Sequence, residues 1–331
     1  MILHLLKSTP SEVTDKLKNE HHARIVLHDE HLQIVTSKST SSIPGFVKSY
    51  VIDSWGFETD VQLANKKYRK KRGVPVGDIH LGGDSNKIHF IAGPCSVESE
   101  EQIFEVAHAL VKLGIKSLRA GCYKPRTSPY SFMGMGKKGL LLLDQVRKET
   151  GLNIVSEVRD STHVDEILEY ADVVQIGAKS MYDHGILRAC GESKKTILIK
   201  RGFGTTLLEF VQAAEFVLSA GNDNVILCER GIRTFETQTR FTLDLCGVAY
   251  LKQHCNIPIF VDPSHALGYR YGIIDLAKAA TAMGVDGLLI EAHPSPDRAK
   301  SDSQQQIDLD HLAKLYHSIH HLASAIDLQL I

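Results

Sequence analysis

Four side chains that could hold a divalent metal follow three short apolar runs of the sequence. Cys95 comes just after the run at 88–92, His265 just after the run at 257–261, and Glu291 and Asp302 follow the run at 287–290. Thiolate and imidazole ligands favour Mn²⁺, Fe²⁺, Co²⁺ or Zn²⁺ over Mg²⁺. A single cysteine near a strand is more often a small buried hydrophobe, so this prediction depends on all four side chains meeting at one place.

A second group of residues near the ends of such runs is cationic. Lys200 and Arg230 end runs of Ile, Leu and Val, and a buried cation without an anion is costly. Substrates that carry more than one phosphate or carboxylate could supply the anions. The alternative is salt bridging to Glu157, Glu229 and Asp262. The cations concerned are Arg119, Lys124, Arg126, Lys179, Lys200, Arg201, Arg230 and Arg233.

The elements that must position these residues alternate between strand and helix. Stretches long enough for a helix separate the apolar runs, so an α/β fold is expected. Eight repeats predict a (β/α)8 TIM barrel, with its active site at the C-terminal ends of the strands. In a closed barrel the first, seventh and eighth strands are neighbours, which would bring the four metal-ligand candidates together. The eight runs are 88–92, 117–120, 153–156, 172–176, 196–199, 224–228, 257–261 and 287–290.

The residues before the barrel predict a small ferredoxin-like α+β domain. We place this domain and its linker at 1–72, and the catalytic barrel with an N-terminal hairpin at 73–331. The expected order is βαββαβ, with strands at 2–6, 23–28, 32–36 and 46–52, a helix at 9–19 and a helical turn at 39–43. The basic run at 66–72 could bind nucleic acid, but a solvated linker is the preferred interpretation. Residues 74–81 read as one arm of a hairpin, with 88–92 or a neighbouring segment as the other, that would plug the bottom of the barrel.

Composition excludes several classes of partner. Among 331 residues the formal net charge is −1 and 43% are hydrophobic, which points to neither nucleic acid nor a membrane surface. No apolar stretch approaches the ~18 residues of a membrane span, and the first residues do not read as a signal peptide. The six cysteines form no CxxC pair, which predicts reduced thiols in the cytoplasm.

Seven segments of the chain resemble DAHP synthase, the 3-deoxy-D-arabino-heptulosonate 7-phosphate synthase family, in its short metal-dependent form. The resemblance covers about residues 75–325, and the leading segment looks like the regulatory extension of some members. The segments are IAGPCSVES (91–99), LRAGCYKPRTSPYSFMGMG (118–136), QIGAK (175–179), LIKRG (198–202), ILCERGIRTFE (226–236), VDPSHALG (261–268) and IEAHPSPDRAKSDSQQ (290–305).

This resemblance implies a reaction and assigns the site residues. Phosphoenolpyruvate would condense with erythrose 4-phosphate, giving DAHP and phosphate, at the entry to the shikimate pathway. Lys124 is the candidate proton donor to the new alkoxide, with His265 or metal-bound water as alternatives. The metal ligands are Cys95, His265, Glu291 and Asp302, with Mn²⁺ preferred. The phosphoenolpyruvate site is Arg119, Lys124, Lys200 and Arg230 beside Glu157, and the erythrose phosphate site is Lys124, Pro125, Arg126, Thr127 and Ser128.

One position departs from the family pattern. The usual Gly-Ala-Arg-Asn after the fourth barrel strand is Gly-Ala-Lys-Ser here, with Lys179 in place of an arginine that helps to hold phosphate. Lysine keeps the charge but loses the paired donors of a guanidinium. Weaker phosphoenolpyruvate binding or a shifted loop would follow.

Three other functions remain open from the sequence alone. The first is KDO-phosphate synthase, a related barrel that uses arabinose 5-phosphate. Its members carry an asparagine-containing loop at the position of 124–127, and some have Asn at the position of Cys95 and need no metal. The second is a catalytically inactive regulatory barrel with a chorismate mutase partner, and the third is an aldolase that forms a Schiff base on Lys200. A homo-oligomer, dimer or tetramer, and feedback by tyrosine or phenylalanine are also expected.

Overall fold

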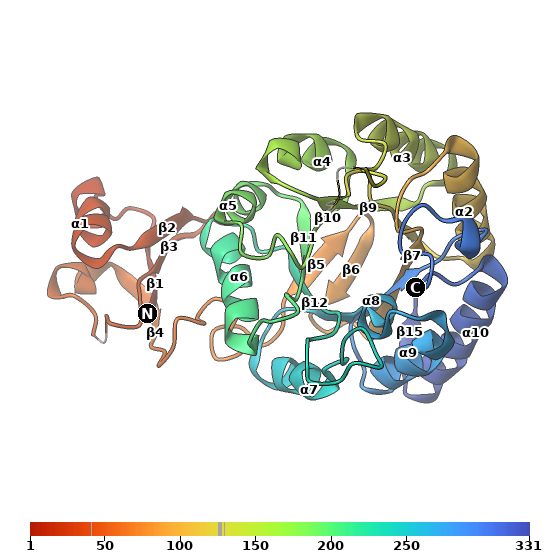
Figure 1. Cartoon of the computed structure of the whole chain (residues 1–331). Helices are drawn as coiled ribbons and strands as arrows, with labels where there is room; N and C mark the ends of the chain where they lie inside the picture. Colours follow the sequence, from red (N-terminus) through yellow and green to blue (C-terminus); the bar gives the residue numbers. More distant parts are fainter. Residues whose placement is uncertain (41, 125–127, 129) are drawn as a thin grey trace.

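The computed structural model describes residues 1–331 except 41, 125–127 and 129. A small N-terminal sheet domain lies beside a larger barrel, next to the helices α5 (His184–Glu192) and α6 (Leu207–Ser219) (Figure 1). Among the described residues, no helix is both long and apolar enough to cross a membrane.

Eight parallel strands form the barrel. They pair in chain order, and the last strand pairs with the first, for example through Leu288 and Phe90. The prediction of a (β/α)8 barrel from eight apolar runs is therefore confirmed. The strands are β7 (Lys87–Gly93), β8 (Ser117–Arg119), β9 (Asn153–Val158), β10 (Val173–Ile176), β11 (Thr196–Lys200), β12 (Val225–Glu229), β13 (Ile259–Val261) and β14 (Gly287–Glu291). A short β15 (Gln329–Leu330) also pairs with the start of β7.

Helices cover the outside of the barrel (Figure 1). Their boundaries follow local capping signals: Ser99 accepts the backbone N–H of Gln102 at the start of α2, and Thr206 and Glu209 form a capping box on α6. Besides α5 and α6, these helices are α2 (Glu100–Leu113), α3 (Lys137–Thr150), α4 (Val164–Tyr170), α7 (Leu245–His254), α9 (Ile273–Ala282) and α10 (Leu309–Ala325). The short helix α8 (Pro263–Leu267) follows β13 inside this ring of helices (Figure 1). Short 3-10 helices in the barrel part of the chain are η2 (Ser161–His163), η3 (Arg270–Gly272) and η4 (Pro296–Arg298).

A hairpin closes the end of the barrel where the strands begin. Its arms are β5 (Gly73–Val76) and β6 (Ile79–Gly82), so both arms lie within the segment predicted to form only one, and the expected pairing with 88–92 is wrong. The two arms pair with each other because of the tight turn at 77–78, where Gly77 has a positive φ of 56°. The expected plug is present. Its apolar residues Val74, Val76 and Leu81 pack against the inward-facing Ile91, Val155, Val173, Leu198, Ile226, Cys228, Phe260 and Leu289.

The N-terminal domain is a four-stranded antiparallel sheet with α1 (Ser11–His21) on one face. The strands β1 (Ile2–Leu6), β2 (Arg24–Leu27), β3 (His31–Val35) and β4 (Val51–Trp55) have the order β2-β3-β1-β4. A 3-10 helix η1 (Gly45–Tyr50) occupies much of the predicted fourth strand at 46–52, which is therefore wrong by several residues. The predicted helical turn at 39–43 includes residue 41, outside the described residues.

The fourth strand begins later than predicted because the apolar residues before it follow a helical period. Phe46, Val47 and Tyr50 all pack into the domain core, and their spacing of one and three residues suits a helical turn, not an alternating strand. Pro44, with its restricted φ, immediately precedes the helix.

The linker is bound to the barrel more tightly than a solvated segment would be. The backbone N–H groups of Gln62, Leu63 and Ala64 donate to the carboxylate of Glu215 on α6 at 2.6, 3.2 and 2.8 Å. Arg72, the last residue of the basic run, is only 1% exposed, although most of that run is exposed as expected. The linker therefore fixes the N-terminal domain to one side of the barrel.

Arg72 should carry much of this attachment. Its guanidinium donates to Asp223 at 2.5 Å, to the side-chain oxygen of Asn256 at 2.9 Å and to the carbonyl of Leu63 at 2.7 Å. We expect Arg72→Met to lower the free energy of unfolding by roughly 1.5–3 kcal/mol, because hydrogen bonds to a charged group are lost in a buried setting. Urea unfolding followed by circular dichroism measures the change.

Arg69→Met is the matched control. Arg69 contacts the same Asp223 at 3.2 Å, but both side chains are more than 40% exposed. The free energy of unfolding should fall by less than about 1 kcal/mol in Arg69→Met, as for surface ion pairs in general. Equal losses in the two variants would contradict the role given to Arg72.

Candidate functional site

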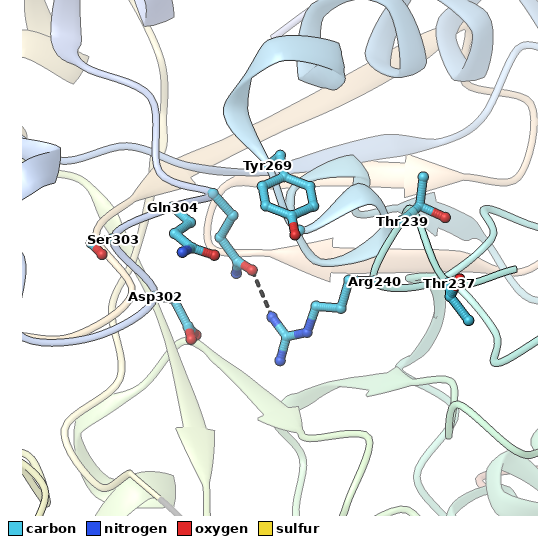
Figure 2. A pocket seen from close by; sticks show the side chains of 9 residues that line it. Thr237, Thr239, Arg240, Tyr269, Asp302, Ser303 and Gln304 are labelled. Atoms are coloured by element: carbon cyan, nitrogen blue, oxygen red, sulfur yellow. Dashed lines mark hydrogen bonds between the residues drawn. The ribbon is translucent and has the colours of Figure 1, made fainter.

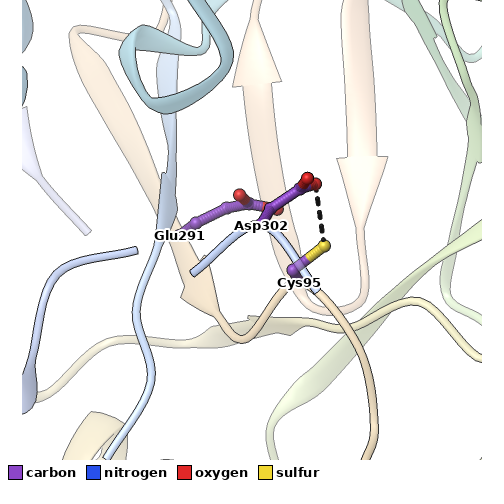
Figure 3. Close-up of side chains that lie close together, drawn as sticks. All are labelled: Cys95, Glu291 and Asp302. Carbon is purple, nitrogen blue, oxygen red and sulfur yellow. Dashed lines mark hydrogen bonds between the residues drawn. The ribbon is translucent and has the colours of Figure 1, made fainter. Parts of the chain in front are cut away.

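Three of the predicted metal ligands converge at the C-terminal end of the barrel. Ligand atoms of Cys95, Glu291 and Asp302 all lie within 4.8 Å of one another, and the Cys95 thiol donates to Asp302 at 3.1 Å (Figure 3). Asp302 has a positive φ of 45°, in the left-handed region that aspartate adopts more readily than most residues other than glycine. Burial, followed by the charge of Glu291, raises the pKa of the Cys95 thiol to about 12.

His265, the fourth predicted ligand, lies beside this cluster but is not part of the three-residue group. Its Nε2 is 3.5 Å from Glu291, and its Nδ1 is 2.7 Å from Asp262. Asp262 also forms a 2.5 Å ion pair with Lys200, and it accepts the backbone N–H of His265 at 2.9 Å. Burial alone would raise the pKa of Asp262, but His265 and Lys200 hold it well below the usual range. The carboxylate thus stays charged and fixes the imidazole.

Two further residues hold Glu291 in place. Arg119 donates to it at 2.8 Å and also donates to the carbonyl of Pro94 at 2.8 Å. Gln305 donates its amide to the other carboxylate oxygen. Burial by itself raises the pKa of Glu291, but His265 and Arg119 bring it below the ordinary value. Arg119 was predicted as a substrate contact, whereas in this structure it is paired with a metal-ligand candidate.

A cavity of about 150 Å³ lies beside the cluster and gathers most of the predicted substrate residues. Its predicted lining residues are Lys124, Glu157, Lys179, Lys200, Arg230, His265 and Asp302. Arg119 is not among them. Ser128 does not line it either, although it is described, and Pro125, Arg126 and Thr127 lie outside the described residues. Phe203, Arg240 and Phe241 also line it, although no motif in the sequence distinguishes them as site residues.

The ion pairs divide the cations into two groups. Lys200 is paired with Asp262, and Arg201 with Glu229 at 2.9 Å and Asp244 at 2.8 Å, so salt bridging does account for part of the positive charge. Within the described part of the chain, Lys179 and Arg230 have no carboxylate within 4 Å. Those two cations remain free for an anion.

Lys124 lies between the cavity and the metal-ligand candidates. It is buried, and its ammonium donates to the carbonyl of Cys95 at 3.0 Å. Burial alone would lower the pKa of Lys124, but the nearby Cys95 and Glu157 raise it above the ordinary value. Lys124 is therefore protonated where it lies, between the substrate cavity and the metal-ligand candidates.

A second cavity of about 440 Å³ adjoins the first and shares Arg240 and Asp302 with it (Figure 2). Arg240 donates to the side-chain oxygen of Gln305 at 2.7 Å, so this cavity is linked to Glu291 through one amide. Gln305 stands in a sequence segment already singled out around Asp302, but no spacing rule distinguishes it from Gln304 or Gln306.

Known proteins are similar to this chain in sequence over most of its length. Residues 60–327 match the sequence model of the DAHP synthetase I family. A phospho-2-dehydro-3-deoxyheptonate aldolase from Thermotoga maritima is 43% identical over 257 residues, which cover 78% of this chain and 75% of the relative. A 2-dehydro-3-deoxyphosphooctonate aldolase from Syntrophotalea carbinolica is 34% identical, covering 73% of this chain and 92% of that one.

Two solved structures are similar to this chain in fold. A crystal structure of phospho-2-dehydro-3-deoxyheptonate aldolase (DAHP synthase) from Thermotoga maritima superposes with a TM-score of 0.81 at 35% identity, covering 100% of this chain and 99% of that one. A truncated form of 3-deoxy-D-arabino-heptulosonate 7-phosphate synthase from the same organism gives a TM-score of 0.76 at 38% identity, covering 81% and 98%.

Proposed function

The chain belongs to the DAHP synthetase I family, and from this premise we propose how its barrel performs the family's reaction. The enzyme condenses phosphoenolpyruvate with erythrose 4-phosphate to give DAHP and inorganic phosphate, the first step of the shikimate pathway. The observation that carries the proposal is the cavity in which Lys179 and Arg230, two cations without carboxylate partners, lie beside the Cys95, Glu291 and Asp302 cluster.

We assign the anions of phosphoenolpyruvate to the cationic wall of the cavity. Lys179 and Arg230 are free for phosphate or carboxylate, and Lys200 contributes charge while Asp262 holds it in place. Fixed cations of this kind orient the substrate and stabilise charge that develops during the reaction. Arg119 contacts the site through Glu291, and Glu157 lines the cavity.

The proton that the reaction requires is assigned to Lys124. The new carbon–carbon bond joins C3 of phosphoenolpyruvate to the aldehyde carbon, so the aldehyde oxygen becomes an alkoxide that needs a proton. Water then adds at C2 of the former phosphoenolpyruvate, and the C2–O bond to phosphate breaks. Lys124 keeps its proton until this point because its surroundings, Cys95 and Glu157 among them, raise its pKa. His265 is the alternative donor, less suited because it is held by Asp262.

The donor set fits a divalent transition metal. One thiol and two carboxylates lie within 4.8 Å of one another, and the imidazole of His265 points its Nε2 toward Glu291. Cys95, His265, Glu291 and Asp302 would hold the ion, with Mn²⁺ proposed first and Fe²⁺, Co²⁺ or Zn²⁺ as alternatives. When bound, it would act as a Lewis acid on the sugar aldehyde. Asp262 would orient His265 as outer-shell carboxylates do at metal sites.

The sugar is assigned from the sequence that follows β8. Lys124, Pro125, Arg126, Thr127 and Ser128 match the erythrose phosphate loop of the family. The octulosonate relatives, 29–34% identical, represent the alternative that uses arabinose 5-phosphate. The higher identity to the heptonate relative supports the four-carbon sugar.

A direct assay tests both the substrate and the metal. We expect purified protein to release phosphate from phosphoenolpyruvate with erythrose 4-phosphate and far more slowly with arabinose 5-phosphate. A chelator should abolish the release and Mn²⁺ should restore it, whereas Cys95→Ala should show little activity with or without Mn²⁺, because one ligand is lost. Asp262→Asn should weaken metal affinity by about 10–100-fold.

Cys246→Ala is the control for cysteine removal, since Cys246 is the exposed cysteine, far from the cluster in the sequence. It should behave like the wild type. Full activity of the Cys95→Ala protein after exhaustive chelation would refute the metal site, and a preference for arabinose 5-phosphate would refute the assigned sugar.

Lys179 gives a second test of the cationic wall. Lys179→Ala should raise the Michaelis constant for phosphoenolpyruvate about tenfold, equivalent to roughly 1.4 kcal/mol. Lys179→Arg should keep activity and lower that constant, because a guanidinium offers paired donors to a phosphate. Lys194→Ala, at an exposed lysine before β11, is the control and should change nothing. An unchanged constant in Lys179→Ala would show that Lys179 does not meet the substrate.

We also propose that the N-terminal domain regulates the barrel as part of a homo-oligomer, dimer or tetramer. The assigned residues all lie beyond the domain, so it has no direct part in the chemistry. Its sheet has two edge strands, β2 and β4, that could pair with another copy. Tyrosine or phenylalanine, products of the pathway, are the proposed inhibitors. The cytoplasm is the proposed location, which six free cysteines support, and a chorismate mutase partner remains a prediction.

Deleting residues 1–55 tests regulation and leaves the docked linker in place. The full chain should be inhibited by tyrosine or phenylalanine, with a coupling of typically 1–3 kcal/mol between the sites, and the shortened enzyme should not. Initial rates with both amino acids measure this. Equal inhibition of both forms would place the sensor in the barrel, and a full-length enzyme that ignores both ligands would exclude this feedback.

A further inference from the structure

We propose that Phe241 is a positioning residue whose ring holds the guanidinium of Arg230 in the orientation that receives the phosphoenolpyruvate anion. This inference rests on the proposed function, and it names a side chain that the reaction chemistry alone would not suggest.

The surroundings of Arg230 create the need for such a residue. Arg230 is buried at the end of β12, and in the described part of the chain its Nε has no hydrogen-bond partner. The carbonyl of Gly231 is 3.5 Å from the guanidinium, which is a weak contact. Burial is also the main cause that lowers the pKa of Arg230. A buried cation in this condition is costly and poorly oriented until an anion arrives.

The nearby carboxylates are committed to other groups. Asp262 bonds Lys200 and His265, while Glu229 bonds Arg201 at 2.9 Å and the backbone N–H of Gly231 at 2.7 Å. Neither forms an ion pair with Arg230. What faces the guanidinium is the ring of Phe241, whose centroid is 4.4 Å from the central carbon of Arg230. A cation above an aromatic ring at this distance is stabilised without being neutralised.

The backbone holds the Phe241 ring in a defined place. Phe241 donates its backbone N–H to the carbonyl of Ala266 at 3.0 Å, and the next residue, Thr242, forms an antiparallel bridge with Ile232. Gly231 has a positive φ of 95°, and a Cβ there would lie 2.7 Å from the Cβ of Phe241. The close approach of the chain at Gly231 therefore requires glycine and brings Phe241 up to Arg230.

A second aromatic ring supports the first. Phe203, in the loop after β11, stacks on Phe241 with centroids 5.5 Å apart and an interplanar angle of 24°. Arg233 lies over Phe203 at 4.8 Å. Both rings line the substrate cavity, so they are not simply core residues. Arg240 also lies over the Phe241 ring, at 5.6 Å, so three arginines and two rings connect the loops that follow β11 and β12.

Substitution of the ring tests this role. We expect Phe241→Leu to raise both the dissociation constant and the Michaelis constant for phosphoenolpyruvate by about 3- to 30-fold, the range of a partly to fully desolvated cation–π contact, with kcat within about twofold. Phe241→Tyr, which keeps the ring, should bind like the wild type. Titration calorimetry with phosphoenolpyruvate alone measures binding without turnover, and steady-state rates give the two constants.

Two controls separate positioning from packing. Phe235→Leu removes a ring on the same loop that is 98% exposed, and it should leave both constants unchanged. If Phe241 acts through Arg230, the double variant Arg230→Leu/Phe241→Leu should bind no worse than Arg230→Leu alone. Where Phe241→Leu fails to fold, Phe241→Met fills similar space without a ring and takes its place.

The outcomes separate the inference from the function on which it rests. Unchanged affinity in Phe241→Leu, an equal loss in Phe241→Tyr, or additive losses in the double variant would overturn the positioning role. A wild-type protein that does not bind phosphoenolpyruvate would instead overturn the proposed function.

Discussion

The buried carboxylate of Asp262 is the group on which the arrangement of the site depends. One oxygen of this side chain lies 2.5 Å from Lys200 and 2.7 Å from His265. It therefore neutralises a buried lysine and fixes a histidine with a single charge. Removing it would leave Lys200 buried without a partner, which is strongly unfavourable, and would free the imidazole that faces Glu291. The cationic wall and the metal-ligand cluster are thus built around one shared residue.

Charge balance then explains why the remaining cations can serve a substrate. Arg119 is neutralised by Glu291, and Arg201 by Glu229 and Asp244. The barrel therefore compensates some of its buried cations and leaves Lys179 and Arg230, which line the cavity, without a carboxylate partner. Because the charge at those two positions is not compensated by carboxylates, a dianionic substrate gains more there than at a fully paired site. Selective pairing, and not the number of cations, defines the anion site.

Much of this could be predicted from the sequence, for a physical reason. Strands buried on both faces read as continuous apolar runs, and polar residues at their ends are conspicuous, so the barrel and Cys95, Lys200, Arg230 and Glu291 could be found. Partners could not. The sharing of Asp262, the pairing of Arg119 with Glu291 and the role of Gln305 depend on distances between loops. The sequence does not predict the second arm of the hairpin or the helix η1. A two-residue turn at Gly77 and a short 3-10 helix produce little periodicity in the apolar residues.

The two phenylalanines of the site also could not be predicted from the sequence, because their role depends on contacts in the folded structure. Phe203 and Phe241 look like ordinary apolar residues in loops, and only their contact with each other and with arginines gives them a role. The closed bottom of the barrel contributes to that role indirectly. Since the hairpin fills the interior below the cavity, it fixes one end of β11, which ends at Lys200, and of β12, which Arg230 follows. The loops after β11 and β12 must then set the remaining freedom of the guanidinium, and two stacked rings pinned by backbone hydrogen bonds can do this without adding a charge that would compete with the substrate.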